Sequence, residues 1–273
     1  MDLCMFPLSY RFERAGAEYR RLGFESGWRR FGNTLMTQVR GGGYLLQTES
    51  VGQFEIQDGM GFLVPVGLRT RVSVPRGETT TAVYSHFHCR VYEAQGLFTV
   101  LDRPVIFDHT TAERIGACND ALIAHQSAPR SVRASVEVSS LLAELVRIAV
   151  DHCPSLETAW RDPVRQRLLP LIRYVQEHLD QPMRRDDLAR VAGLSVPHLH
   201  ALFVRAFNTA PMELVRRERM QRARQLLHWS DLSVAEVAMQ CGFEDQYYFS
   251  RAFKGAEGVP PSHYRRAVRA SSS

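Results

Sequence analysis

The stretch 242–266, GFEDQYYFSRAFKGAEGVPPSHYRR, decides how the second half of this chain folds. Phe249 and Phe253 are four residues apart, so both lie on one face of a helix, and we expect that face to be buried. Gly242 precedes the helix and is typical of a tight turn. The other positions predict a second face that carries hydrogen-bond donors, namely Gln246, Tyr247, Ser250, Arg251 and Lys254.

An earlier segment repeats this pattern. Residues 186–207, DDLARVAGLSVPHLHALFVRAF, resemble residues 235–254, AEVAMQCGFEDQYYFSRAFK. Corresponding residues lie 49 apart up to the glycine and 50 apart after it, in the pairs Ala189 and Ala238, Gly193 and Gly242, Leu199 and Phe249, Phe203 and Phe253, and Pro211 and Pro261. A short helix, a glycine turn and a second helix, present twice, predict two helix-turn-helix units.

Positive charge is concentrated in this half. Residues 161–273 hold 18 Arg and Lys against 12 Asp and Glu, a net charge of +6, whereas residues 1–160 hold 16 against 17, a net charge of −1. Such asymmetry indicates a polyanionic partner, although charge that only confers solubility would look similar. Arginine can bind guanine through two hydrogen bonds and glutamine can bind adenine, so the donor face predicts binding to double-stranded DNA. The alternative is the solvated face of a structural helix.

The first helix-turn-helix unit lacks the cationic side chains of the second. By the repeat, the equivalents of Tyr247, Arg251 and Lys254 are Pro197, Ala201 and Val204. The donors of this unit are His198, His200 and Arg205, and His198 aligns with Tyr248, which is compatible with a packing role. We therefore expect Pro197, His200 and Arg205 to lie at the DNA but to contact bases weakly, so that the second unit carries more of the specificity.

These motifs resemble the AraC/XylS family of bacterial transcription regulators over about residues 168–266. The resemblance rests on LARVAGLS, RMQRARQLL, VAEVAMQCGFEDQYYFSRAFK and PPSHYRR. It implies a seven-helix DNA-binding domain with a long helix, about residues 212–228, between the two units. Seventeen helical residues span about 25 Å, which with the flanking turns suits recognition helices one DNA turn, about 34 Å, apart. We expect an activator that acts as a homodimer and changes the recruitment of RNA polymerase.

Short apolar segments broken by Gly, Pro or Asp fill residues 10–107 and predict a β-sandwich or small barrel. FEIQDGMGFLVPVG (54–67) and YSHF (84–87) resemble the cupin-type sensor domain of AraC-like regulators. This resemblance implies a β-barrel that binds a small-molecule inducer, such as a sugar. The candidate ligand-binding residues are Trp28, Arg29, Arg40, Tyr44 and His86. The alternative for each of them is a purely structural role.

The segment HFHCRVYE (86–93) raises the question of a metal. His86 and His88 share one face of a strand, and with Glu93 they resemble the metal motif of enzymatic cupins. A metal-dependent cupin enzyme fused to a DNA-binding tail is therefore one rival hypothesis, and a regulator without a ligand is another. No second His-bearing segment completes the motif, and the sequence has no Ser/His/Asp arrangement, P-loop or GxGxxG. We expect no metal, no cofactor and no enzymatic activity.

Two amphipathic helices are predicted next, over 111–126 and 131–152. The second has an apolar stripe, which either packs on the barrel or forms a homodimer seam, composed of Val138, Leu141, Leu142, Leu145, Ile148 and Ala149. The expected class is α+β. The expected division is a cupin-like sensor over 1–110, a helical dimerisation segment over 111–152, a linker over 153–163 and the DNA-binding domain over 164–273.

The remaining composition bears on the compartment. Five cysteines without a CxxC motif predict reduced thiols rather than disulfides or a zinc site. The N-terminus has no apolar segment of signal-peptide length, and no run of about 18 apolar residues occurs. We therefore expect a cytoplasmic protein that does not interact with a membrane.

Overall fold

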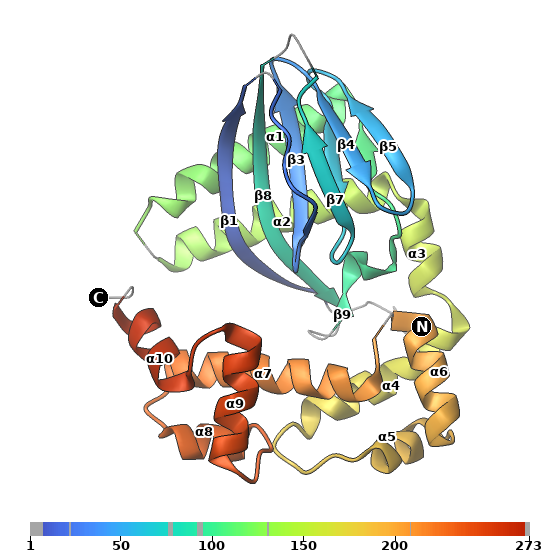
Figure 1. Ribbon diagram of the computed structural model, residues 1–273, viewed down its shortest axis with the longest axis vertical. Helices are drawn as coiled ribbons and strands as arrows, with labels where there is room; N and C mark the ends of the chain where they lie inside the picture. Colours follow the sequence, from blue (N-terminus) through green and yellow to red (C-terminus); the bar gives the residue numbers. More distant parts are fainter. Residues whose placement is uncertain are drawn as a thin grey trace. The chain divides into compact units, whose positions relative to one another are not determined.

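The computed structural model describes residues 8–21, 23–75, 79–91, 95–129, 131–207 and 209–270. The chain forms two compact units that divide between Asp162 and Pro163, here called the N-terminal and C-terminal units (Figure 1). Among the helices that the structure describes, none is both long and apolar enough to span a membrane.

The strands of the N-terminal unit form two antiparallel sheets. In the first sheet the strands are ordered β1 (Leu8–Arg20), β8 (Thr80–Val91), β3 (Thr34–Arg40), β6 (Gly61–Val64) and β10 (Val105–Phe107), with β9 (Gln95–Gly96) paired to β8. In the second sheet the order is β2 (Arg29–Arg30), β7 (Arg69–Ser73), β4 (Tyr44–Thr48) and β5 (Gly52–Ile56). The α+β class is therefore confirmed. The cupin-like closed barrel is not, because no described strand of one sheet pairs with a strand of the other.

The period of two along each strand decides what the sheets enclose. In β3, Leu35 and Thr37 face the second sheet, whereas Met36 lies on the opposite face and is fully buried under the helices. A core cluster joins the inner faces of both sheets and contains Val39, Tyr44, Leu46, Ile56, Phe62, Val64, Val74 and Ala82. The inner face thus combines this apolar core with the side chains that line a cavity.

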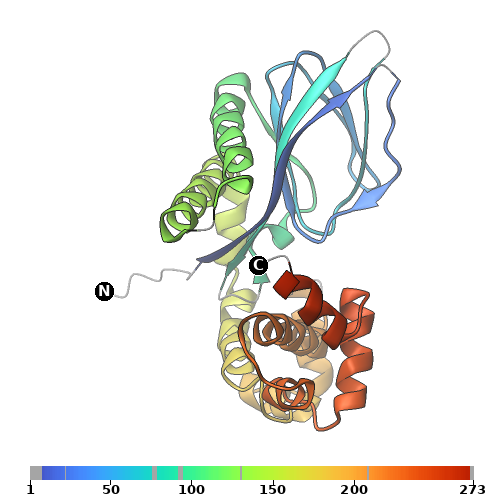
Figure 2. The same cartoon turned by 90° about the vertical axis from the view of Figure 1, so that its left-hand side faces the viewer.

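Two helices, α1 (His109–Gln126) and α2 (Val132–Asp151), cover the outer face of the first sheet (Figure 2). Asp108 caps α1 by accepting a hydrogen bond from Thr111 N at 2.9 Å. The fully buried Asn119 fixes α1 on the sheet, because its amide donates to the carbonyl oxygens of Met36 (3.2 Å) and Val83 (3.0 Å).

The segment predicted as a linker contains a helix, α3 (Pro154–Trp160), and a 3-10 turn, η1 (Leu97–Val100), lies against it. Pro154 suits the first helical turn, where its missing N–H is no loss. The buried Trp160 donates its indole N–H to Leu97 O at 2.9 Å. Most of this segment is therefore part of the N-terminal unit, and it ends next to the division at Asp162.

The apolar stripe of α2 is used mainly inside the unit. Leu145 and Ile148 have no exposed surface and Leu142 has 1%, so the core-packing alternative holds for this part of the helix. Val138 and Leu141 are only partly buried.

The C-terminal unit consists of seven helices within residues 163–207 and 209–270, as the AraC/XylS resemblance implied. They are α4 (Pro163–Glu177), α5 (Arg185–Ala192), α6 (Val196–Phe207), α7 (Pro211–Trp229), α8 (Val234–Gln240), α9 (Gln246–Glu257) and α10 (Pro261–Ala270). The predicted long helix over 212–228 is α7, which is one residue longer at each end.

The internal repeat extends to the backbone hydrogen bonds of the two turns. Leu194 N donates to Ala189 O at 3.0 Å, and the equivalent bond joins Phe243 N to Ala238 O at 2.9 Å. The glycine between them has a φ of 62° at position 193 and 71° at position 242, a conformation that favours glycine. The two helix-turn-helix units therefore share one turn geometry.

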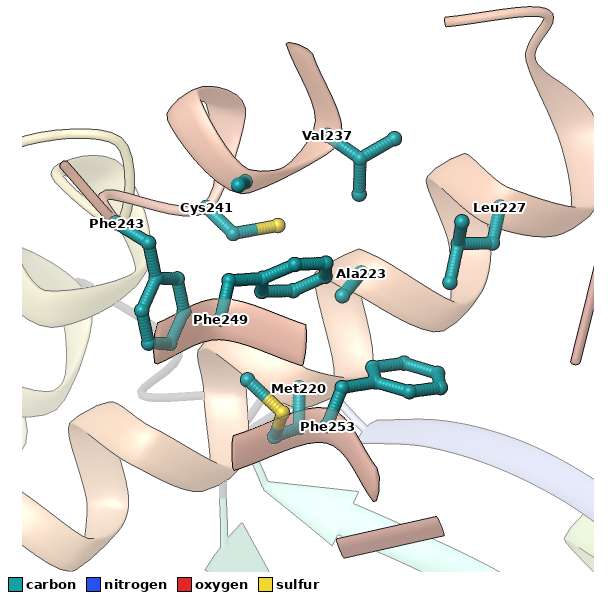
Figure 3. Packing of buried hydrophobic residues seen from close by; sticks show 9 residues of the cluster. Met220, Ala223, Leu227, Val237, Cys241, Phe243, Phe249 and Phe253 are labelled. Atoms are coloured by element: carbon teal, nitrogen blue, oxygen red, sulfur yellow. The ribbon is translucent and has the colours of Figure 1, made fainter. Parts of the chain in front are cut away.

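The second helix-turn-helix unit is built around an apolar cluster (Figure 3). Phe249 and Phe253 point between α7 and α8, and neither has exposed surface. Their neighbours in the cluster are Met220, Ala223, Leu227, Val237, Ala238, Cys241 and Phe243. The prediction that these two phenylalanines form the buried face of the helix is confirmed.

Candidate nucleic-acid interface and inter-sheet cavity

The two buried phenylalanines fix the rotation of α9 about its axis. Asp245 caps the helix by accepting from Tyr247 N at 2.7 Å, which sets where it begins. The side chain of Tyr247 is 80% exposed. Of the other predicted DNA-binding residues on this helix, three are exposed and Ser250 is partly buried; the exposed ones are Gln246, Arg251 and Lys254. The structure thus gathers all five on the free side of α9.

No described residue provides a partner for the donors on this side. Across the described residues, the side chains of Gln246, Arg251 and Lys254 make no hydrogen bond or ion pair. Other arginines of the unit are engaged: Arg165 donates to Ala206 O at 2.8 Å, and Arg224 pairs with Glu257. The α9 donors are therefore available to an external acceptor without the loss of an internal contact.

The equivalent helix of the first unit, α6, presents a less polar surface. Its exposed positions are Pro197, His198, His200, Ala201, Val204 and Arg205. His198 is exposed, as is Tyr248, with which it aligns. Pro197, His200 and Arg205, the predicted DNA-binding residues, lie on the free side of the helix, where Ala201 and Val204 contribute an apolar patch.

One basic residue near this surface escaped the sequence analysis. Arg185, the first residue of α5, lines a pocket together with His200 of α6. The signal was available, because two arginines, Arg184 and Arg185, directly precede the repeated segment that begins at Asp186. In helix-turn-helix proteins this helix crosses the DNA backbone, so a cation here suits a phosphate.

A cavity of about 670 Å³, its open mouth included, lies between the two sheets of the N-terminal unit. Three predicted ligand-binding residues line it: Arg29, Tyr44 and His86. The sequence analysis missed other polar lining residues, which are Arg14, Glu18, Arg20, Ser26, Thr37, Thr70, Arg71 and Tyr84. Their signal was weak, because β1 carries polar residues on both of its faces.

The other two predicted ligand-binding residues lie elsewhere. Arg40 is on the helix-facing side of β3, where it binds Gln38 Oε1 at 2.7 Å and Asp120 Oδ2 of α1 at 2.8 Å. Trp28 is 40% exposed, and the guanidinium of Arg71 lies 5.1 Å from the centre of its ring. Arg40 does not face the cavity because side chains alternate along a strand. It lies an odd number of residues from the cavity-lining Leu35 and Thr37, and therefore on the opposite face of β3.

His86 is held in one tautomer at the cavity wall. Arg14 Nη2 lies 3.3 Å from His86 Nε2, and since a guanidinium can only donate, Nε2 accepts. His86 Nδ1–H then donates to Asn33 Oδ1 at 2.8 Å. Burial, and next the positive charge of Arg14, lower the pKa of His86 to about 4, so the ring is neutral near pH 7.

His88 and its neighbours continue this network. Its Nε2 lies 2.6 Å from Glu13 Oε1, and Asn33 donates to the other oxygen of Glu13. The hydrogen bond from His88 is the main reason that the pKa of Glu13 falls to about 2. The predicted third metal ligand, Glu93, lies outside the described residues. Among the residues with described positions, no three His, Cys, Asp or Glu side chains are grouped to hold a metal ion.

The comparisons with known proteins agree with the C-terminal geometry. A family model described as "Helix-turn-helix domain" matches residues 188–267. The raffinose operon transcriptional regulatory protein RafR of Pediococcus pentosaceus is 30% identical over 140 residues, which cover 51% of this chain and 50% of that protein. The transcriptional activator NphR of a Rhodococcus species is 33% identical over 146 residues, covering 53% and 43%.

A solved structure, the DNA-binding domain of the global transcriptional factor AdpA in complex with a target DNA, is 32% identical with a TM-score of 0.37; it covers 38% of this chain and 94% of that one. The chain spans about half the length, or less, of the two curated relatives. Fold and match together define the C-terminal unit as a helix-turn-helix DNA-binding domain. The similarity to AraC/XylS regulators that the sequence motifs predicted is thus found over this unit.

Proposed function

We propose that this protein is a sequence-specific transcriptional regulator that binds duplex DNA through α6 and α9 and responds to a small molecule in the inter-sheet cavity. The observation that carries the proposal is the free side of α9. It presents Gln246, Arg251 and Lys254, all exposed and without an internal partner in the described part of the chain. Such donors on the second helix of a helix-turn-helix unit match the chemistry of base edges in the major groove.

The length of α7 supports simultaneous binding by both units. Its 19 residues span about 28 Å, and the turns at its two ends add to the separation of α6 and α9. Successive major-groove segments on one side of B-DNA repeat every 34 Å or so. We propose that α9 carries most of the base specificity, while α6 contributes backbone contacts and apolar contacts to bases.

The remaining parts of the proposal concern the N-terminal unit. An open cavity between two sheets can hold a ligand as a closed cupin-type barrel does, so we retain a cupin-type sensor controlled by an inducer. The exposed side of α2 is our proposed homodimer surface, because Val132 and Val136 are 83% and 60% exposed and lie one helical turn apart. We propose activation through RNA polymerase in the cytoplasm. The similarity to NphR, a transcriptional activator, supports activation rather than repression.

The structure does not favour the rival of a metal-dependent cupin enzyme. His86 and His88, which would supply the first ligands, are already engaged by Arg14, Asn33 and Glu13. Metal analysis of the purified protein distinguishes the two hypotheses: a stoichiometric divalent ion that survives dialysis would favour the enzyme.

The experiment that tests the proposal is selection of binding sites from randomised duplex DNA by the full chain. We expect one enriched motif, and we expect its affinity to fall steeply with salt as counterions are released. Absence of any enriched motif, with binding that is weak and equal for all sequences, would contradict sequence-specific regulation.

A further inference from the structure

The charges that face the inter-sheet cavity come from one strand of each sheet. On β1, Arg14, Glu18 and Arg20 are separated by even numbers of residues, so all three lie on the inner face. On β2, Arg29 pairs in register with Thr70, another cavity residue. Three guanidinium groups and one carboxylate therefore line the cavity, an excess of two positive charges.

Arg71 also contributes to the lining, but its charged group is directed elsewhere. Its Nε donates to Gln47 Oε1 at 2.6 Å, and it forms an ion pair with Glu25. Gln47 lies between Leu46 and Thr48, which face inward, so it is on the outer face of β4. The guanidinium of Arg71 is thus held outside the cavity and is not counted.

The single carboxylate in the cavity is already satisfied. Glu18 forms an ion pair with Arg20, and Tyr84 donates its hydroxyl to Glu18 Oε1 at 3.2 Å. The interactions of Arg14 with described residues are a hydrogen bond to the neutral His86 and a cation–π contact with the ring of Tyr84. Neither Arg14 nor Arg29 makes an ion pair with any described residue. The excess positive charge is therefore located on these two arginines.

The rest of the wall is largely apolar and aromatic. Residues from both sheets and from the segments on either side of β2 provide it, among them Phe24, Phe31, Leu35, Leu46, Phe62 and Val64. Such walls take up the hydrocarbon part of a ligand, while a few polar groups fix its orientation. Arginine binds a carboxylate through two parallel charge-assisted hydrogen bonds, which neutral hydroxyl groups cannot match.

We propose that the ligand of this cavity is a small organic carboxylate with an apolar body, whose charged end binds Arg14 and Arg29, rather than an uncharged sugar. The proposal rests on the proposed sensor function and narrows its ligand class. The carboxylate supplies the negative charge that the described residues do not, and the apolar body fills the space beside Phe31 and Phe62.

The first test compares acids with their uncharged amides on the full chain. The probes are benzoate, phenylacetate, hexanoate and decanoate, each paired with its amide, and raffinose and galactose as neutral sugars. Binding is measured by isothermal titration and by the shift in melting temperature. We expect at least one acid to bind, with its amide at least tenfold weaker. The proposal is overturned if amides bind as well as acids, if only the sugars bind, or if none of the acids binds.

The second test uses two adjacent arginines. Arg29→Gln removes a cavity charge, whereas Arg30→Gln removes the neighbouring charge, which pairs in register with the outward-facing Arg69. For the acid that binds best, we expect about tenfold or greater loss with Arg29→Gln. With Arg30→Gln we expect less than twofold loss. Equal losses would show a general charge effect and overturn the assignment, as would full affinity in Arg29→Gln.

The same preparations are assayed for DNA binding. Sequence-specific DNA binding without acid binding would refute the ligand class alone. Acid binding without any sequence-specific DNA binding would refute the proposed function but leave the cavity assignment intact.

Discussion

Replacing Arg251 by alanine should reduce DNA affinity without changing the stability of the protein. Arg251 is exposed and makes no ion pair with a described residue, so its removal should alter the free energy of unfolding by no more than about 0.5 kcal/mol. A bidentate contact to guanine contributes about 1–3 kcal/mol of discrimination. Loss of it should therefore weaken binding to the selected site about 5- to 160-fold.

The assay is fluorescence anisotropy on the selected duplex and on single-base variants, at several salt concentrations. If Arg251 contacts a base, the alanine variant loses its preference at one base pair. Arg251→Lys should lose that preference too, because lysine keeps the charge but lacks the planar fork. If Arg251 contacts a phosphate, all duplexes weaken equally and the salt slope falls by about one.

A matched control is Arg216→Ala, which removes the same charge from α7, where Arg216 pairs with Glu213 at 3.7 Å. Its affinity should change much less. In the first unit, Ala201→Arg should raise affinity for all sequences without adding specificity. If Arg251→Ala binds every duplex as the wild type does, the deduced role of the free side of α9 is refuted.

Three further predictions test the packing and the electrostatics. Gly242→Ala should lower the free energy of unfolding, measured by urea denaturation, more than Gly193→Ala does. A Cβ at position 242 would clash with Leu179 O, whereas no described atom lies within 4 Å of a Cβ at position 193. Equal losses would contradict the close approach of Leu179 O to Gly242. Leu145→Asp should unfold the N-terminal unit, because it places an unpaired charge in the core, and a folded Leu145→Asp unit would refute the assigned burial. Val136→Asp should leave the unit folded, because Val136 is exposed, but should dissociate the proposed dimer, as measured by sedimentation. His86 has an ordinary pKa near 6.5 in the unfolded state and about 4 in the folded state, so between these pH values the unfolded state binds more protons at His86, and the free energy of unfolding should fall by about 3 kcal/mol as the pH drops. The measurement is urea denaturation at several pH values in a Trp229→Phe background, followed by Trp fluorescence. The free energy of unfolding should depend less on pH in His86→Gln, and an unchanged pH dependence would assign the effect to other groups.

The C-terminal unit was predictable because its signals are local. Phenylalanines four residues apart, a glycine before them and a 49-residue repeat fix two helices and the turn between them, whatever packs around them. The exposure of Arg251 follows from the burial of Phe249 and Phe253 on the same helix. The position of Arg185 beside His200 was not predicted, since it depends on how α5 and α6 pack.

The inter-sheet cavity was much less predictable, because its composition depends on strand pairing. Arg40 is of a residue type that often binds ligands, but its position in β3 directs its side chain toward Asp120 of α1. In β1, the sequence alone does not show which of the alternating polar residues face inward; pairing of Arg14 with His86 in β8 decides it. The apolar stripe of α2 was recognised, but whether Leu145 packs inside the unit or in a dimer required the structure.

The most direct test of DNA binding through both units is a footprint of the full chain on its selected site, with methylation interference at guanine N7. The account predicts two protected major-groove segments on the same side of the duplex, about 10 base pairs apart. It also predicts that Arg251→Ala loses the guanine contact in only one of them. Protection of a single segment, or uniform protection without preferred guanines, would contradict recognition by α6 and α9 together.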